Sequence, residues 1–216
     1  MANLVGGIIG RFSKQGNTQA PVPHRLTGLQ SLAVAQIEPM NAEAARAGVR
    51  FGGGTQIIAN GIAPVAAIPT TTATLYLYNG DPTRSYLVDQ LDFYLGSGTA
   101  AAGATLLATV AKLTSAAPTA NATGYGSQSM SGSSRTSKAF WSTAGTLAAG
   151  TNWVPMISTL QLAAANVGQG DQVQQTWGSI LVPPGYVLGI AILSGAGTTP
   201  LYAIGAIWDE LELDLE

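Results

Sequence analysis

The sequence predicts an all-β protein in which an antiparallel β-sandwich follows an extended N-terminal arm. Three observations point to this fold class. Short apolar stretches, several of them alternating with polar residues, recur from about Thr70 onward, as expected for strands with a buried face. Gly, Pro and Asn separate these stretches and supply the turns. The sequence has no long amphipathic helical pattern, which argues against an α/β fold.

Residues 1–50 are predicted to form an arm or collar, and residues 51–216 the sandwich domain. The arm contains a polar, proline-bearing stretch that favours an extended chain. Asn41 is expected to cap a short helix that ends at Gly48, because the residues between them are mostly strong helix formers. Gly52–Gly54 are then expected to interrupt the chain.

Seven or eight strands are expected after this point, separated by turns such as Asn79-Gly80-Asp81-Pro82. Such a series of short strands indicates a sandwich or a barrel. The segments that predict strands are Ala73–Tyr78, Tyr86–Leu95, Thr105–Val110, Ala139–Trp141, Trp153–Leu162, Ile180–Val182, Tyr186–Leu193 and Leu201–Trp208.

The second of these segments alternates most clearly. Leu87, Leu91 and Phe93 are predicted to share the buried face, with Asp89 as the polar exception on it. Asp92 should lie on the opposite face, so that the two carboxylates cannot flank one scissile bond. The final segment is predicted to alternate in the same way, with leucines inward and acids outward.

The segment Thr114–Lys138 consists mainly of Ser, Thr, Ala, Gly and Asn. A connection this long is uncommon in a compact domain unless it is functional or disordered. The sequence leaves two interpretations open: an extended loop that lies against a partner, or a disordered surface loop.

Charged residues make up only 9% of the chain, whereas hydrophobic residues make up 46%. An average soluble protein carries about 25% charged residues. A surface of Ala, Gly, Ser and Thr favours contact with neighbouring subunits, because few ions must be desolvated. We therefore expect a homo-oligomer or a larger assembly, with a monomer of uncharged surface as the alternative.

The net charge of −2 argues against nucleic acid as the main partner, since phosphate binding requires clustered Lys and Arg. The chain has no cysteine and no apolar run of the ~18 residues that a membrane span needs. It also lacks the pattern of a secretory signal, so synthesis and folding in a cytoplasm are expected.

Catalytic, cofactor and metal motifs are missing from the sequence, and we expect neither an enzyme nor a cofactor. The single histidine, His24, lies in the predicted arm without an orienting partner. The acidic residues of the last eight positions lack the glycine-punctuated spacing of a calcium loop, so no metal site is expected there.

The two ends of the chain carry opposite charge. Candidate partner contacts are the basic residues of the arm and the acidic residues of the tail, which would place one subunit's arm against its neighbour's tail. Solvated charges at both ends are the alternative. These candidates are Arg11, Lys14, Arg25, Asp209, Glu210 and Glu212.

The tryptophans Trp141, Trp153, Trp177 and Trp208 lie on or beside predicted strands. Aromatic residues at such positions are mostly core or interface anchors. They can also line a sugar-binding groove, and a carbohydrate- or receptor-binding module of a phage fibre or spike is the alternative function.

Ile180–Ile190, followed by a closing strand that ends in acids, resembles the last hairpin of viral jelly-roll proteins. Ala63–Thr70, which leads into Leu75–Asn79 and Ser85–Asp89, is similar to structural proteins of tailed phages. The resemblance implies a jelly-roll-like sandwich and a virion component, such as a decoration or cement protein on the capsid. Its partners would be the major capsid protein or neighbouring subunits, and such proteins often form trimers.

Overall fold

The computed structural model describes residues 40–100, 103–158, 172–194 and 197–212. The chain separates into two units, Met1–Glu43 and Ala44–Glu216. Most of the predicted arm, including His24, lies outside the described residues. The described residues belong to the second unit, apart from the first turn of a short helix that spans the boundary.

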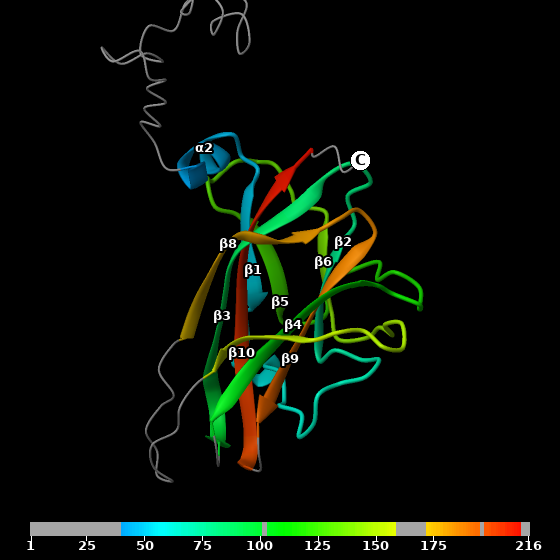
Figure 1. The fold of residues 1–216 in the computed structure, drawn as a ribbon. Coiled ribbons are helices and arrows are strands. Elements are labelled where there is room, and N and C mark those ends of the chain that lie inside the picture. Colours follow the sequence, from blue (N-terminus) through cyan, green and yellow to red (C-terminus); the bar gives the residue numbers. More distant parts are fainter. Residues whose placement is uncertain (1–39, 101–102, 159–171, 195–196, 213–216) are drawn as a thin grey trace, which may run out of the picture. The chain divides into compact units, whose positions relative to one another are not determined.

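The second unit is an antiparallel β-sandwich of two five-stranded sheets (Figure 1), which confirms the predicted fold class. Sheet 1 has the strand order β5-β1-β10-β3-β8, and sheet 2 the order β6-β2-β9-β4-β7. The strands are β1 (Arg50–Thr55), β2 (Leu75–Asn79), β3 (Ser85–Ala100), β4 (Ala104–Lys112), β5 (Tyr125–Ser129), β6 (Ala139–Ser142), β7 (Val154–Ser158), β8 (Gln172–Val182), β9 (Tyr186–Ser194) and β10 (Gly197–Leu211).

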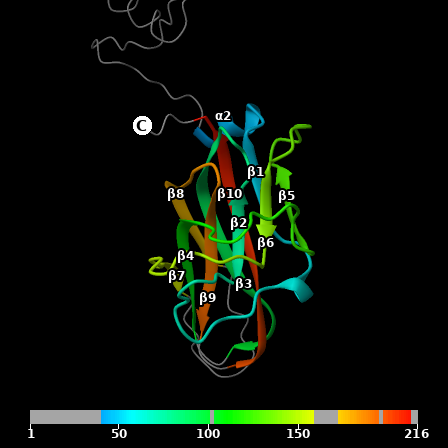
Figure 2. The ribbon, with the colours of Figure 1, turned by 90° about the vertical axis from the view of Figure 1, so that its right-hand side faces the viewer.

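The strand pairs are nested, so that the chain forms one long antiparallel ribbon that is rolled into two layers. β1 pairs with β10, β2 with β9, β3 with β8 and β4 with β7. Strands far apart in the sequence, such as β1 and β10, therefore lie side by side in both ribbon views (Figure 1 and Figure 2). This winding is that of a jelly roll, and β5 and β6 extend the two sheets beside β1 and β2.

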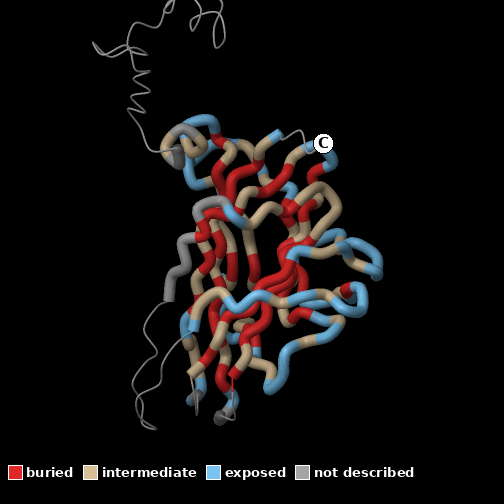
Figure 3. Tube along the Cα trace, viewed as in Figure 1, coloured by how far each residue is buried: buried red, intermediate tan, exposed pale blue. Residues whose placement is uncertain are grey.

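The core lies between the sheets, and buried residues follow the strands whereas exposed residues lie mainly in the connections (Figure 3). Its largest side chains are aromatic. Trp208 of β10 packs against Phe51, Tyr86 and Trp141, with ring centroids 6.2–6.3 Å apart. Tyr125 stacks on Trp141 from β5. Each such buried ring contributes about 1.5–3 kcal/mol of hydrophobic free energy.

Gly52–Gly54 were predicted to interrupt the chain. This prediction was wrong, because all three residues lie inside β1. Phe51 anchors the strand in the core, and β1 is hydrogen-bonded on both sides, to β5 and β10. Glycine has no side chain to mark a buried or an exposed face, so alternation of apolar and polar residues could not predict this strand.

The predicted long loop Thr114–Lys138 also contains a strand, β5. Its sequence, YGSQS, is poor in the residues that favour strands. Pairing with β1 and burial of Tyr125 against Trp141 stabilise this strand, although its residues have low strand propensity. The prediction of a continuous loop was therefore wrong in its middle part.

A β-bulge at Asp89 changes the faces that alternation predicts for β3. Val88 and Gln90 have partners on β10, whereas Asp89 between them has none in the register. Val88 is buried and Leu87 is only partly buried, the reverse of the prediction for Leu87. The bulge turns Asp89 to the outer face, where it meets Arg50. Asp89 and Asp92 therefore do not lie on opposite faces.

The predicted turn and the predicted short helix are both present, but the helix includes Met40, so Asn41 lies within it and does not cap it. Asn79 is fully buried, and its amide donates to the carbonyls of Arg84 and Val182 at 2.8 Å, which fixes the turn before β3. The helix α2 spans Met40–Arg46, and Gly48 follows its end with a φ of 69°, the left-handed conformation that favours glycine after a helix. Within the part of the chain that the structure describes, no helix has the length and apolarity to cross a membrane.

Candidate functional site: a glycine-floored trough

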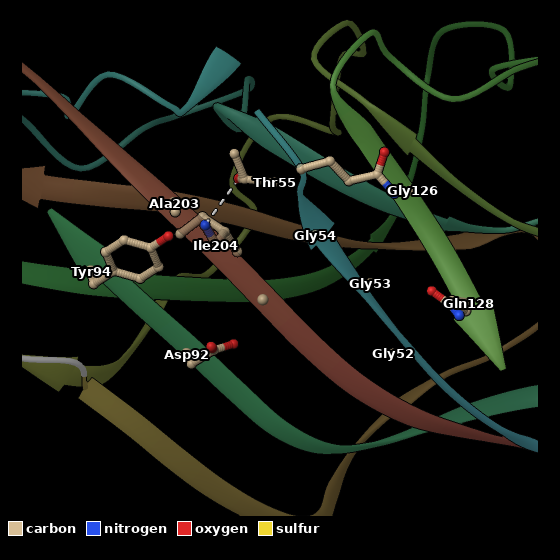
Figure 4. Close-up of a pocket in the computed structure, with 12 residues that line it drawn as sticks. Gly52, Gly53, Gly54, Thr55, Asp92, Tyr94, Gly126, Gln128, Ala203 and Ile204 are labelled. Carbon is tan, nitrogen blue, oxygen red and sulfur yellow. Dashed lines mark hydrogen bonds between the residues drawn. The ribbon is translucent and has the colours of Figure 1, made fainter. Parts of the chain in front are cut away.

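A trough of about 240 Å³ lies on the outer face of sheet 1, over β5, β1, β10 and β3 (Figure 4). It exists because glycines replace side chains where four strands run side by side. Gly126 of β5 pairs with Gly54 of β1, Gly54 pairs with Gly205 of β10, and Gly205 pairs with Asp92 of β3. Three glycines in one row across the sheet, with Gly52 two residues away, leave the backbone as the floor.

Polar side chains lie at both sides of this floor. A Cβ atom added at Gly205 would collide with the carboxylate of Asp92, and one added at Gly126 would collide with the amide of Gln56. These two polar groups therefore lie directly over the outer glycines of the row. Gln128 stands on β5, on the far side of β1 from Asp92 (Figure 4).

Tyr94 gives the trough an aromatic wall. It lies two residues after Asp92 on the same face of β3, and 42% of its surface is exposed. The tyrosine side chain has an apolar ring and a polar hydroxyl, so one residue can both stack on a ligand and form a hydrogen bond with it. The ring, a carboxylate and two amides thus surround a flat floor. This combination offers hydrogen bonds and a stacking surface to one small polar ligand.

A cluster of three buried charges lies on the same outer face. Arg50 donates from Nη1 to both carboxylate oxygens of Asp209, at 3.1 and 3.2 Å, and from Nη2 to Asp89 at 2.5 Å. All three residues are buried. Burial raises the pKa of Asp209, and Arg50 opposes this shift while Asp89 adds to it. The geometry is that of an internal ion cluster that ties β1, β3 and β10 together.

Glu210 is only 1% exposed. Its side chain points to the inner face of sheet 1, as that of Trp208 does, whereas the neighbouring Asp209 points to the outer face. The Glu210 carboxylate accepts a hydrogen bond from Ser137 at 2.5 Å, and Arg135 lies 3.9 Å away. Burial raises the pKa of Glu210, whereas Ser137 and Arg135 lower it by less. Burial and the nearby Glu210 also raise the pKa of Tyr86. The prediction that the acids of the last strand point outward was wrong for Glu210.

The structure places the predicted partner contacts as follows. Arg11, Lys14 and Arg25 lie outside the described residues. The carboxylates of Asp209 and Glu210 are held by residues of the same chain. Only Glu212 of the described candidates is exposed, and it lies 3.3 Å from Arg84. A contact of these acids with another subunit stays a prediction.

The three tryptophans whose side chains the structure describes do not line the trough. Trp141 and Trp208 are fully buried in the core, and Trp153 packs beside a second small cluster that contains Tyr76. Trp177 lies in β8, and its side chain lies outside the described part. The aromatic wall is Tyr94, which was not singled out from the sequence. Its position two residues after Asp92 on the polar face of β3 was the available signal.

A second hollow, of about 280 Å³, has an apolar lining and lies between β4, β7, β8 and β9. Val110 and Val154 are among the exposed large hydrophobic residues of the molecule and form part of its wall, with Met156 and Ile180 beside them. Exposed apolar residues that gather in one place mark surfaces suited to protein contact.

The fold and these two surfaces define the class: an antiparallel jelly-roll sandwich with a polar trough on one sheet and an apolar hollow elsewhere on its surface. Comparison with known proteins finds no family model, no curated protein and no solved structure that matches this chain. In the described ranges, no group of three His, Cys, Asp or Glu residues is placed to hold a metal ion.

Proposed function

We propose that the chain is a structural subunit of a virus particle, of the decoration or cement kind in a tailed phage, and that it works by binding neighbouring subunits. The jelly-roll winding supports this proposal, because many viral capsid domains are built on it. The resemblance of Ile180–Ile190, which forms the end of β8 and the first part of β9, to viral jelly-roll hairpins supports it as well.

The observation that carries the proposal is where the few charges lie. Of the charged residues described, Arg50, Asp81, Asp89, Asp209 and Glu210 are buried, and each has an ion-pair partner in its own chain. The surface of the described residues is therefore poorer in ions than their number of charged residues alone would indicate. Contact between such surfaces requires little desolvation of charge.

The apolar hollow is the surface of the described residues that best fits such a contact. Val154 is 56% exposed, and Val110 lies beside it on the neighbouring strand of sheet 2. Covering this apolar area contributes about 25 cal/mol per Å². Many copies then add their contacts through multivalency, so that each single contact can be weak.

Sedimentation velocity of the full chain over a range of concentrations tests the proposal. The expected result is a mass that rises with concentration, and a loss of this association in Val154→Asp. The control variant Thr143→Asp adds the same charge at an exposed site outside the hollow and should associate as the wild type does. A chain that stays monomeric at all concentrations would contradict the proposal.

A further inference from the structure

The glycine row across sheet 1 lowers stability, and of its glycines only Gly54 is required by the backbone, because its φ is 154° and a Cβ there would meet the carbonyl oxygen of Ile204. Glycine inside a strand is destabilising by roughly 0.5–1 kcal/mol relative to alanine, because it loses more conformational freedom and packs no side chain. Gly52, Gly54, Gly126 and Gly205 all lie in strand interiors of one patch. Glycine in strands marks places where a ligand or another backbone approaches closely.

We propose that the trough over Gly52, Gly54, Gly126 and Gly205 binds one neutral sugar ring of a glycan. Its volume of about 240 Å³ lies below the range of about 300–1,000 Å³ of pockets for drug-sized ligands, and so fits a single ring. Asp92 and Gln56 lie over Gly205 and Gly126, so the ring approaches the sheet at Gly54 between them, and the walls supply its contacts. This site is separate from the apolar hollow and does not depend on the structural role proposed above.

The wall chemistry matches a sugar. The exposed ring of Tyr94 provides a surface for the C–H face of a pyranose, and Asp92 accepts hydrogen bonds from its hydroxyl groups. The amides of Gln56 and Gln128 both donate and accept. Asp92 is the only charged residue that lines the trough within the described residues, and no cation lines it there. These surroundings favour a neutral sugar over one that carries a carboxylate.

A peptide strand is a poorer occupant. Peptides that bind sheets commonly add a strand to an unpaired edge, where their backbone completes the ladder. The floor of the trough is the face of β1 and β10, and each of these strands is already paired on both sides. A ligand on this face must bind through groups other than backbone hydrogen bonds, as a sugar does through its hydroxyls and ring.

The test starts with the full chain on a glycan array, followed by calorimetric titration of the binding glycan and of the methyl glycosides of glucose, galactose, mannose and N-acetylglucosamine. Three variants address the wall and the floor: Tyr94→Ala, Asp92→Asn and Gly126→Ala. The last is compatible with folding, because a Cβ there meets only the mobile end of Gln56. The controls Ile68→Ala and Glu212→Gln change an exposed apolar and an exposed acidic residue outside the trough and the apolar hollow.

We expect saturable binding of a neutral glycan that weakens about tenfold or more in each trough variant, which corresponds to one or two lost contacts, and that stays unchanged in both controls. Circular dichroism of each variant ensures that lost binding is not lost folding. The proposal is overturned if no neutral glycan binds, if sialylated glycans bind more tightly than neutral ones, or if the folded trough variants bind as the wild type does. It is also overturned if they change only the oligomeric state.

Discussion

At the scale of single residues, Arg50 is the clearest case of a charge whose role is internal. It joins two carboxylates that lie 39 and 159 residues away in the sequence. From the sequence, basic residues near the start of the chain were expected to meet the acidic tail of a neighbouring subunit. Arg50 and Asp209 instead form an ion pair with each other within one chain.

Replacement of Arg50 by Ala should destabilise the fold by about 3–5 kcal/mol, because Asp89 and Asp209 then remain buried without their cation. Urea unfolding followed by tryptophan fluorescence measures this loss. Glu212→Ala is the matched control: the exposed Glu212 pairs with Arg84, and such surface pairs contribute about 0–1 kcal/mol. Equal losses in the two variants would contradict the buried role of Arg50.

Glu210 predicts a dependence of stability on pH. Burial raises its pKa above the ordinary value of 4.5, so the folded chain holds this proton more tightly than the unfolded chain does. The contribution of Glu210 to stability is therefore largest below pH 4.5 and decreases as the pH rises to the raised pKa. Glu210→Gln should remove this decrease. Unfolding free energies of both proteins at a series of pH values test it, and a parallel pH profile would contradict the assignment.

At the scale of elements, β1 carries glycine on both faces of sheet 1, and the reason differs between the two faces. A Cβ at Gly53 would meet the carbonyl oxygen of Gly126 and, at 3.0 Å, the indole nitrogen of the buried Trp141. A Cβ at Gly52 would meet first the sulfur of Met130, at 2.7 Å, and Met130 is exposed. Packing thus requires glycine at position 53, whereas no fixed neighbour requires it at position 52.

Gly53→Ala should therefore destabilise the protein by about 1–3 kcal/mol, as expected when a group is forced against fixed backbone. Gly52→Ala should range from no change to about 1 kcal/mol of stabilisation, since the end of Met130 can move aside and the unfolded chain loses freedom. Thermal unfolding of the two variants in parallel makes the comparison. A larger loss for Gly52→Ala would mean that the assignment of the two faces is wrong.

The elements also show what a sequence can and cannot predict here. β3 was predicted because burial of one face leaves apolar residues with a period of two, and β9 because it is a nearly continuous apolar stretch between turns. β1 and β5 were missed because their glycine and serine residues carry no such period. The bulge at Asp89 inverted the predicted faces of Leu87 and Val88, since one extra residue breaks the alternation between the side chains before it and those after it.

The trough was beyond prediction for a related reason. Its floor and walls come from four strands whose residues meet only through the register of β5, β1, β10 and β3. Asp92 and Tyr94 could be assigned to one polar face from the sequence, but their nearness to Gly205 and Gly126 depends on strand pairings between segments far apart in the chain.

At the scale of the whole molecule, the proposed association rests on uncharged surface and predicts a weak response to salt. Raising NaCl from about 0.1 to 1 M shortens the range of electrostatic interactions from about 10 to 3 Å. The association constant of the full chain, measured by sedimentation equilibrium, should change by less than about threefold over this range, because few ion pairs would be screened. A steep decrease with salt would indicate that charged residues hold the subunits together.

The nested winding has a consequence for the timing of folding in the cell. β10 follows every other strand of the sandwich in the chain, yet it occupies the centre of sheet 1 between β1 and β3. While the ribosome is still translating the sandwich, these two strands have nothing between them, and the sheet cannot close. Sheet 1 can therefore be completed only after β10 has left the exit tunnel.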